Sequence, residues 1–150
     1  MEKLREGGFL MSKIRKLSER IFAKLLRDFE VTEVTAAQGR VMFPLWQEDD
    51  ISFQELKKKT SLSKATLSKM LDILEKAGHI ARVRSKEDKR TIYIKLTKKD
   101  RELQNKYILV SEKMTKVFYD GFTEVEIDEF EDYLRRLLDN LTLFINNSKS

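Results

Sequence analysis

Apolar residues recur at helical spacing near both ends of the chain. Near the start they lie three or four positions apart, which predicts one long helix over residues 9–29. The same period returns near the end and predicts a last helix from a capping box at residues 123–126 to about residue 146. Both helices have wide apolar faces, which a single chain of this size does not readily cover. Positions on these faces include Ile14, Leu17, Ile21, Leu25, Leu134, Leu141, Phe144 and Ile145.

Three shorter helices are predicted between these two. Residues 35–38 and 52–55 each have the hydroxyl residue and the Gln or Glu of a capping box, which opens a helix. We expect the first of these helices to end around Pro44 to Trp46 and to bend or terminate at Pro44, because proline has no N–H to donate inside a helix. A third helix is expected over residues 63–77. Gly78 follows it, at the position where glycine commonly ends a helix with left-handed backbone angles.

The apolar pattern then changes from helical to alternating. Residues 80–84 and 91–96 predict two strands, which a charged loop at residues 85–90 joins. Thr97 is expected to cap a long helix that runs to about residue 120. The predicted fold is therefore mainly α with a small β-hairpin.

Charge is distributed unevenly along the chain. The 150 residues have a formal net charge of +5, but residues 57–101 contain fifteen Lys or Arg and five Asp or Glu, a net of +10. The remaining residues contain fifteen bases and twenty acids, a net of −5. A basic segment between more acidic ends suits a surface that meets a polyanion. A run of charges is, however, also common on ordinary solvated faces.

Composition argues against several classes of function. The chain has no cysteine and one histidine, His79, so disulfides, thiolate metal sites and a serine-histidine-aspartate triad are not expected. No apolar run approaches the roughly 20 residues of a membrane helix, and the N-terminus lacks the apolar core of a signal peptide. No nucleophile-elbow, zinc-protease or phosphate-loop motif occurs. We expect a cytoplasmic protein that is not an enzyme, without catalytic residues, metal, cofactor or membrane partner.

The third short helix, the helix before it and the hairpin after it have the order and spacing of a winged helix-turn-helix. One face of the third helix is apolar and docks it, while the other offers small, hydroxyl and lysine side chains that suit the major groove of DNA. These side chains are Lys64, Ala65, Thr66, Ser68 and Lys69. The hairpin tip offers Lys86, Lys89 and Arg90, which suit phosphates or the minor groove.

Each of these features also has an ordinary structural explanation. An amphipathic helix is often only a core helix, and a basic hairpin is often only a solvated turn. The main alternative function is a winged-helix module that binds a protein and not DNA. Such a module favours a neutral or acidic recognition helix, in contrast to Lys64 and Lys69. The features favour DNA because they occur together and in this order.

Several motifs resemble the multiple-antibiotic-resistance regulator (MarR) family, and the resemblance covers nearly the whole chain. Two positions depart from the family pattern: His79 stands where an apolar residue is common, and Asp100 where glycine is common. The matching motifs are Thr35-Ala-Ala-Gln38, Leu62-Ser-Lys-Ala-Thr66, Leu74-Glu-Lys-Ala-Gly78, Ile80, Arg82, Asp88-Lys-Arg90 and Leu96-Thr-Lys-Lys-Asp-Arg-Glu-Leu103.

The resemblance implies a homodimeric transcription regulator, and most simply a repressor, that binds a pseudo-palindromic operator in double-stranded DNA. It adds Ser63 to the DNA side of the third helix, although Ser63 also suits the N-cap of that helix. It makes Arg90 the residue for the minor groove. Asp88 is expected to stabilise the wing by pairing with Arg82 or Arg90, since a carboxylate near phosphate is repelled.

The resemblance also divides the chain by role. Residues 35–96 form the winged helix-turn-helix lobe, and residues 1–34 and 97–150 form a dimerisation region. The wide apolar faces of the terminal helices support this division independently. The expected interface residues are Ile14, Leu17, Ile21, Leu141, Phe144 and Ile145.

Members of this family often bind small phenolic or amphipathic molecules between the dimer base and the DNA-binding lobe. Aromatic residues that suit such an effector pocket are Phe22, Phe43, Trp46, Tyr107 and Phe118, although aromatic residues at helical spacing are more often plain core. His79 is expected to be a half-buried packing residue, because the sequence gives it no evident partner.

Overall fold

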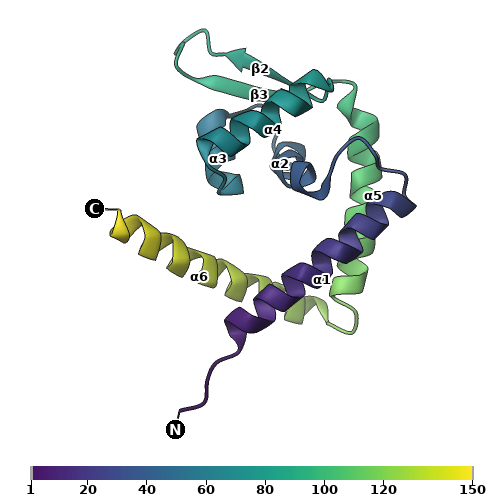
Figure 1. Ribbon diagram of the computed structural model, residues 1–150, viewed down its shortest axis with the longest axis vertical. Coiled ribbons are helices and arrows are strands. Elements are labelled where there is room, and N and C mark those ends of the chain that lie inside the picture. Colours follow the sequence, from purple (N-terminus) through teal and green to yellow (C-terminus); the bar gives the residue numbers. More distant parts are fainter. Residues whose placement is uncertain (1, 150) are drawn as a thin grey trace. The chain divides into compact units, whose positions relative to one another are not determined.

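The computed structural model describes residues 2–149, which form two compact units (Figure 1). One unit contains the chain up to Met114, and the other starts at Thr115. No helix within the described residues is long and apolar enough to cross a membrane.

The first unit is mostly helical and contains one small antiparallel sheet. In this sheet β3 lies between β1 and β2, with Ile94 opposite Ile51 on one side and Arg82 on the other. The predicted mainly α fold with a β-hairpin is confirmed. The elements are α1 (Gly7–Asp28), α2 (Ala36–Gln47), β1 (Ile51–Ser52), α3 (Phe53–Thr60), α4 (Lys64–Lys76), β2 (Ile80–Arg84), β3 (Ile92–Leu96) and α5 (Asp100–Phe118), which continues into the second unit.

Local side-chain chemistry determines where these helices begin and end. At α2, Thr35 and Gln38 form the predicted capping box, with each side chain accepting the backbone N–H of the other residue. At α3, the Ser52 hydroxyl accepts the N–H of Glu55 at 3.1 Å. Gly78 follows α4 with φ of +87°, a conformation that glycine adopts without the steric cost of a Cβ.

Three details differ from the sequence predictions. Helix α2 continues through Pro44 and ends at Gln47, one residue beyond the predicted range, because its face containing Met42 and Leu45 is fully buried and holds the last turn in place. Strand β1 was not predicted, since two residues are too few to show an alternating pattern. Helix α5 begins at Asp100, so the prediction that Thr97 caps it was wrong; the Thr97 hydroxyl donates to the carbonyl of Gly78.

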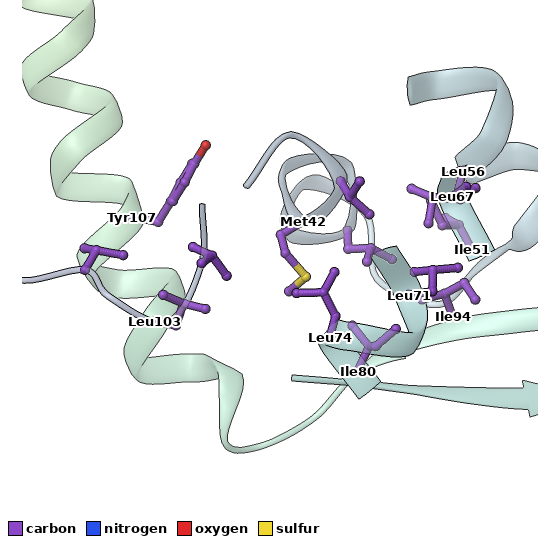
Figure 2. Close-up of a cluster of buried hydrophobic side chains, with 14 of the residues drawn as sticks. Met42, Ile51, Leu56, Leu67, Leu71, Leu74, Ile80, Ile94, Leu103 and Tyr107 are labelled. Atoms are coloured by element: carbon purple, nitrogen blue, oxygen red, sulfur yellow. The ribbon is translucent and has the colours of Figure 1, made fainter. Parts of the chain in front are cut away.

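A continuous apolar core joins α2, α4 and the sheet (Figure 2). Leu67 and Leu71 of α4 are fully buried, and Leu74 is 1% exposed. In Figure 2, Leu71 and Leu74 lie among side chains from α2 and the strands, including Met42 and Ile80. Burial of each such leucine contributes about 1.5–3 kcal/mol. The core therefore fixes which face of α4 points inward.

The second unit consists of the end of α5, a turn and α6 (Glu124–Ser148). Gly121 has φ of +83° and lies between the two helices. Thr123 and Glu126 form the predicted capping box of α6. The Tyr119 hydroxyl donates to Glu131 at 2.9 Å and its ring contacts Phe122 and Phe130. None of the described residues of α6 is buried.

Candidate nucleic-acid interface

Helix α4 has two chemically distinct faces. The leucine face is buried in the core, whereas Lys64, Ala65, Thr66 and Lys69 are exposed and Ser68 is half-buried. The exposed side chains belong to the first turns of the helix. Lysine and hydroxyl groups on small or flexible side chains are suited to base edges and phosphates. The structure thus brings the predicted α4 residues together on one accessible face.

Ser63 is occupied by its role as the N-cap of α4. Its hydroxyl accepts the N–H of Thr66 at 3.2 Å and donates to the Thr66 hydroxyl at 2.9 Å. The N-terminal backbone N–H groups of the helix carry partial positive charge and point outward from this end. Ser63 therefore acts chiefly as the N-cap of a helix end that carries partial positive charge.

The wing is the β2–β3 hairpin with its loop at residues 85–90, and hydrogen bonds within the loop shape its tip. The Ser85 hydroxyl accepts the N–H groups of Glu87 and Asp88, both at 3.2 Å. Asp88 accepts the N–H of Arg90 at 3.0 Å, and Arg84 donates to the Lys89 carbonyl. The cationic side chains exposed on this tip are those of Lys86, Lys89 and Arg90.

Asp88 stabilises the wing through its own loop. Its carboxylate lies 3.5 Å from the Arg90 guanidinium and accepts the Thr91 hydroxyl at 3.3 Å. Of the two partners that the sequence left open for Asp88, the structure selects Arg90. The Arg90 side chain is 95% exposed, so this ion pair is weak and leaves the guanidinium accessible.

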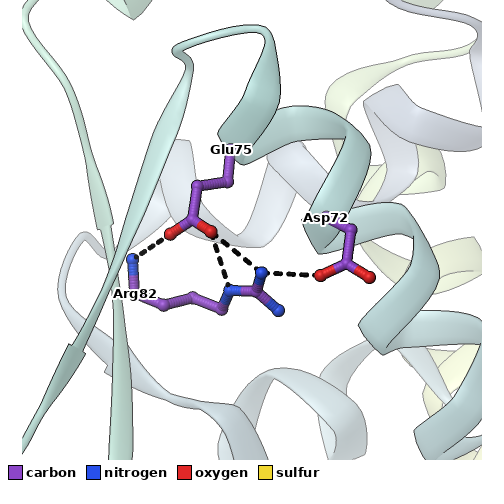
Figure 3. A network of polar contacts seen from close by, with 3 residues as sticks. All are labelled: Asp72, Glu75 and Arg82. Atoms are coloured by element: carbon purple, nitrogen blue, oxygen red, sulfur yellow. Dashed lines mark hydrogen bonds and ion pairs between the residues drawn. The ribbon is translucent and has the colours of Figure 1, made fainter.

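Arg82 joins the wing to α4 (Figure 3). Its guanidinium donates to Glu75 at 2.9 Å and to Asp72 at 2.6 Å, and its backbone N–H donates to Glu75 at 3.0 Å. These bonds connect the first residues of β2 with the C-terminal half of α4. The sequence analysis missed both acidic partners, although Glu75 lies within the Leu74–Gly78 motif.

The hydrogen bonds between Arg82 and Glu75 shift the pKa values of both groups. Hydrogen bonds from Arg82 hold the pKa of Glu75 below its ordinary value, and the same bonds raise the pKa of Arg82. Both groups therefore stay charged throughout the neutral range. The single positive charge of Arg82 offsets part of the negative charge of Asp72 and Glu75, which lie on the helix carrying Lys64 and Lys69.

His79 has a partner that the sequence did not indicate, so the expectation of a half-buried packing residue was wrong. It is 3% exposed, and its Nδ1 lies 3.2 Å from Oδ1 of Asp100, which is 1% exposed. The Trp46 indole N–H donates to the other Asp100 oxygen at 2.6 Å. Burial raises the pKa of Asp100, and the Trp46 bond and His79 oppose that rise.

The five aromatic residues predicted for an effector pocket do not lie together. Phe22, Trp46 and Tyr107 pack on one another, with Tyr107 centred 5.5 Å from Phe22 and 4.5 Å from Trp46. Burial raises the pKa of Tyr107 to about 12. Phe118 belongs to the second unit, where it contacts Tyr119.

Phe43 lines a different space, an open cleft of about 400 Å³ between α1, α2, α3 and α4. Its walls combine apolar side chains with three cations, and its lining residues are Arg15, Ala37, Arg40, Phe43, Pro44, Lys59, Thr60, Leu62 and Met70. Glu19 accepts from Arg15 at 3.1 Å and from Arg40 at 3.4 Å, and these bonds lower its pKa.

The six residues predicted for a dimer interface are all exposed within the chain. They occupy two helices that belong to different units. On α1, Ile14, Leu17 and Ile21 are 46%, 49% and 37% exposed. On α6, Leu141, Phe144 and Ile145 are 55%, 73% and 55% exposed.

Comparison with known proteins identifies the family. A sequence model described as the MarR family matches residues 34–92, from the start of α2 to β3. Residues 34–92 form a domain of the MarR family. It is 35% identical over 109 residues to the HTH-type transcriptional regulator TtmR of Methylorubrum extorquens (strain PA1). That match covers 73% of the chain and 51% of TtmR, so the chain spans about half of that relative.

Solved structures of MarR-family proteins share the fold. A mutant MarR from E. coli, complexed with operator DNA, has a TM-score of 0.74 and 25% identity, covering 91% of this chain and 99% of that one. Bordetella bronchiseptica BpsR, whose DNA binding is regulated by 6-hydroxynicotinic acid, has a TM-score of 0.76 and 22% identity. The BpsR match covers 89% of this chain and 98% of BpsR, and supports the fold alone.

Across residues 2–149 no group of three or more His, Asp or Glu side chains is placed to hold a metal ion.

We predict that Arg82→Met and Glu75→Gln are coupled in a double-mutant cycle. Because the Glu75 side chain is 39% exposed, solvent limits the coupling energy to about 1 kcal/mol or less at neutral pH. The pKa of folded Glu75 is lowered, so this stability is present above the unfolded pKa and is lost as the pH falls through the folded one. Urea unfolding at about pH 7 and about pH 3 measures it.

Glu87→Gln is the control for this cycle, since it removes the same charge from the exposed wing tip. It should show no coupling to Arg82→Met. Equal coupling at both pH values would contradict the assigned contact.

Proposed function

We propose that this protein binds double-stranded DNA through α4 and the wing, and that it regulates transcription, as a repressor, by occupying an operator. The observation that carries the proposal is that one lobe has two exposed groups of cationic side chains, one at the start of α4 and one at the tip of the wing. We place the protein in the cytoplasm, with the DNA that it regulates, and assign it no catalytic role.

Helix α4 is suited to the major groove. Ala65 and Thr66 are small enough to let the helix approach the base edges, and Lys64 and Lys69 flank them with charge for bases and phosphates. The wing tip, with Lys86, Lys89 and Arg90, then meets the neighbouring backbone or minor groove, where narrow A·T-rich segments attract arginine.

The proposed assembly is a homodimer that presents two such lobes to a pseudo-palindromic site. We assign residues 35–96 to the DNA-binding lobe and residues 1–34 and 97–150 to dimerisation. The exposed apolar residues of α1 and α6 support this assignment, because a large unpartnered apolar surface is unfavourable in water. Two-fold symmetry then spaces two α4 helices about one duplex turn apart.

The relatives support the same function. TtmR is named as an HTH-type transcriptional regulator, and the mutant E. coli MarR was solved with operator DNA. The alternative, a winged helix that binds only protein, is not favoured by the lysines on α4.

We also propose a small aromatic acid as effector, bound in the cleft that Phe43 lines. Phe43, Leu62 and Met70 supply apolar contact, and Arg40 and Arg15 supply charge for a carboxylate. BpsR, which is regulated by 6-hydroxynicotinic acid, has the same fold and supports this ligand class. A ligand that joins α1 to α4 at this cleft would favour one spacing of the two recognition helices.

Arg90→Ala should weaken DNA binding by about 1–3 kcal/mol. The probe is the duplex enriched from a random DNA pool, and fluorescence anisotropy measures the affinity at several salt concentrations. Loss of one phosphate contact should also reduce the slope of log affinity against log salt by about 1. Lys113→Ala, which removes an exposed charge from α5, is the control. Failure to enrich any duplex, or an unchanged affinity of Arg90→Ala, would refute the assignment.

Leu141→Lys should shift the protein from dimer to monomer, with a dissociation constant raised at least about tenfold, because a charge enters an apolar contact without a partner. Sedimentation equilibrium measures this change. Asn140→Lys adds the same charge about 100° away around α6 and should leave the dimer intact. A wild-type protein that sediments as a monomer at micromolar concentration would be inconsistent with the proposed assembly.

Benzoate and 6-hydroxynicotinate should raise the melting temperature, since a ligand at 100 times its dissociation constant stabilises the fold by about 2.7 kcal/mol. Arg40→Ala should abolish the increase. The control Arg27→Ala removes an arginine of α1 that does not line the cleft, and it should retain the increase. Benzyl alcohol, which lacks the carboxylate, should have no effect. Retention of the increase in Arg40→Ala would argue against this cleft as the site.

A further inference from the structure

The buried contact between His79 and Asp100 is the strongest polar feature that DNA recognition does not use. His79 Nδ1 and Asp100 Oδ1 are 3.2 Å apart, within ion-pair distance, and neither of these two buried atoms has a hydrogen-bond partner within residues 2–149. Two ionisable groups at this depth are costly unless they balance each other's charge.

The contact between His79 and Asp100 lies where several elements of the fold meet. His79 follows α4 and Gly78 directly and precedes β2, so it lies where the candidate recognition helix meets the wing. Asp100 is the first residue of α5, the helix that leads out of the winged lobe. Trp46 adds the last turn of α2 through its 2.6 Å bond to Asp100. A change at this contact therefore acts on three elements at once.

Backbone bonds tie the same elements together around the pair. The His79 N–H donates to Leu74 and its carbonyl accepts the N–H of Thr97 at 3.1 Å. The Lys99 ammonium donates to the carbonyl of Ala77 at 2.7 Å. A few hydrogen bonds near the buried pair thus hold the end of α4 beside the start of α5.

The pair carries no net charge when it holds one proton. The proton lies either on the imidazole, giving an ion pair, or on the carboxyl, giving two neutral groups. A second proton leaves a buried cation without a counter-ion, which is unfavourable in a site of low polarity. Burial raises the pKa of the Asp100 carboxyl, so this group takes up a proton at a higher pH than an exposed aspartate does.

The other charged groups around the pair do not replace either partner. Asp49 lies close enough to oppose ionisation of Asp100, but its carboxylate accepts the N–H of Leu96 at 2.9 Å. On α4, Glu75 is held by Arg82. The remaining cations beside Asp100 line an adjoining cleft or bind a backbone carbonyl, and they are Lys98, Lys99 and Arg101.

We propose that His79 and Asp100 form a proton-sensitive switch: with one proton they hold the start of α5 against the end of α4, and a second proton releases this contact and weakens DNA binding. The switch rests on the proposed DNA-binding function. Its sign is diagnostic, because acidification makes the rest of the chain more positive and would otherwise strengthen binding to a polyanion.

Trp46 provides a direct readout, since it is the only tryptophan and its indole N–H contacts Asp100. We expect the single indole N–H signal in NMR spectra to shift in one step, above the ordinary aspartate range of about pH 4, as the pH is lowered from about 8. The step should be absent in Asp100→Asn. It should move to higher pH in His79→Leu, because His79 favours the ionised carboxylate. Glu102→Gln, which removes an exposed acid from the same helix, should leave it unchanged.

DNA affinity measured over the same pH range tests the coupling. Wild-type affinity for the enriched duplex should fall at least about threefold from pH 7 to pH 5, and saturating duplex should lower the midpoint of the indole step by about half a pH unit, as linkage requires. The double variant His79→Leu/Asp100→Asn cannot titrate there, and replacing a buried ionic pair is often tolerated. It should bind DNA as tightly at pH 5 as at pH 7.

The outcomes separate the two proposals. An indole signal without a step above about pH 4, in a protein that binds DNA, would overturn the switch alone. The same pH dependence of affinity in the wild type and the double variant would also overturn it. A clear step in a protein that binds no duplex at any pH would overturn the DNA-binding function, and with it the coupling to DNA.

Discussion

The orientation of α4 depends on the three leucines that it buries. Leu67, Leu71 and Leu74 recur at helical spacing and fill the space between α2 and the sheet, which fixes the rotation of the helix about its axis. Successive residues of a helix differ by about 100° in direction, so a rotation by one position would expose a leucine and bury a polar group. The outward direction of Lys64 and Lys69 is thus a consequence of packing on the opposite side.

Local chemistry made most of the fold predictable. The capping boxes at Thr35 and Thr123 satisfy backbone N–H groups within three residues of themselves, so their effect is visible in a short stretch of sequence. The change from helical to alternating apolar positions after Gly78 located the wing for the same reason. The exposed basic residues of α4 and of the wing followed from these elements, because the buried face leaves only one face for them.

Contacts between distant segments were not predictable in the same way. Trp46 and Asp100 are 54 positions apart, and no periodic pattern relates an indole in one helix to a carboxylate at the start of another. Four acids lie within ten residues of Arg82 along the sequence, and only the packing of β2 on α4 brings it to Glu75 and Asp72 rather than to the acids of the wing loop. β1 depends wholly on its pairing with β3. Each of these contacts depends on the tertiary structure.

The hydrogen bonds inside the wing loop have a consequence for the entropy of association. Ser85, Asp88 and Arg84 hold the backbone of the tip in one conformation before any partner arrives. A disordered tip would lose much of its conformational freedom on docking, at about 1–2 kcal/mol for each residue fixed. A preorganised tip avoids most of that loss, so more of the attraction between its cations and a polyanion is retained as affinity.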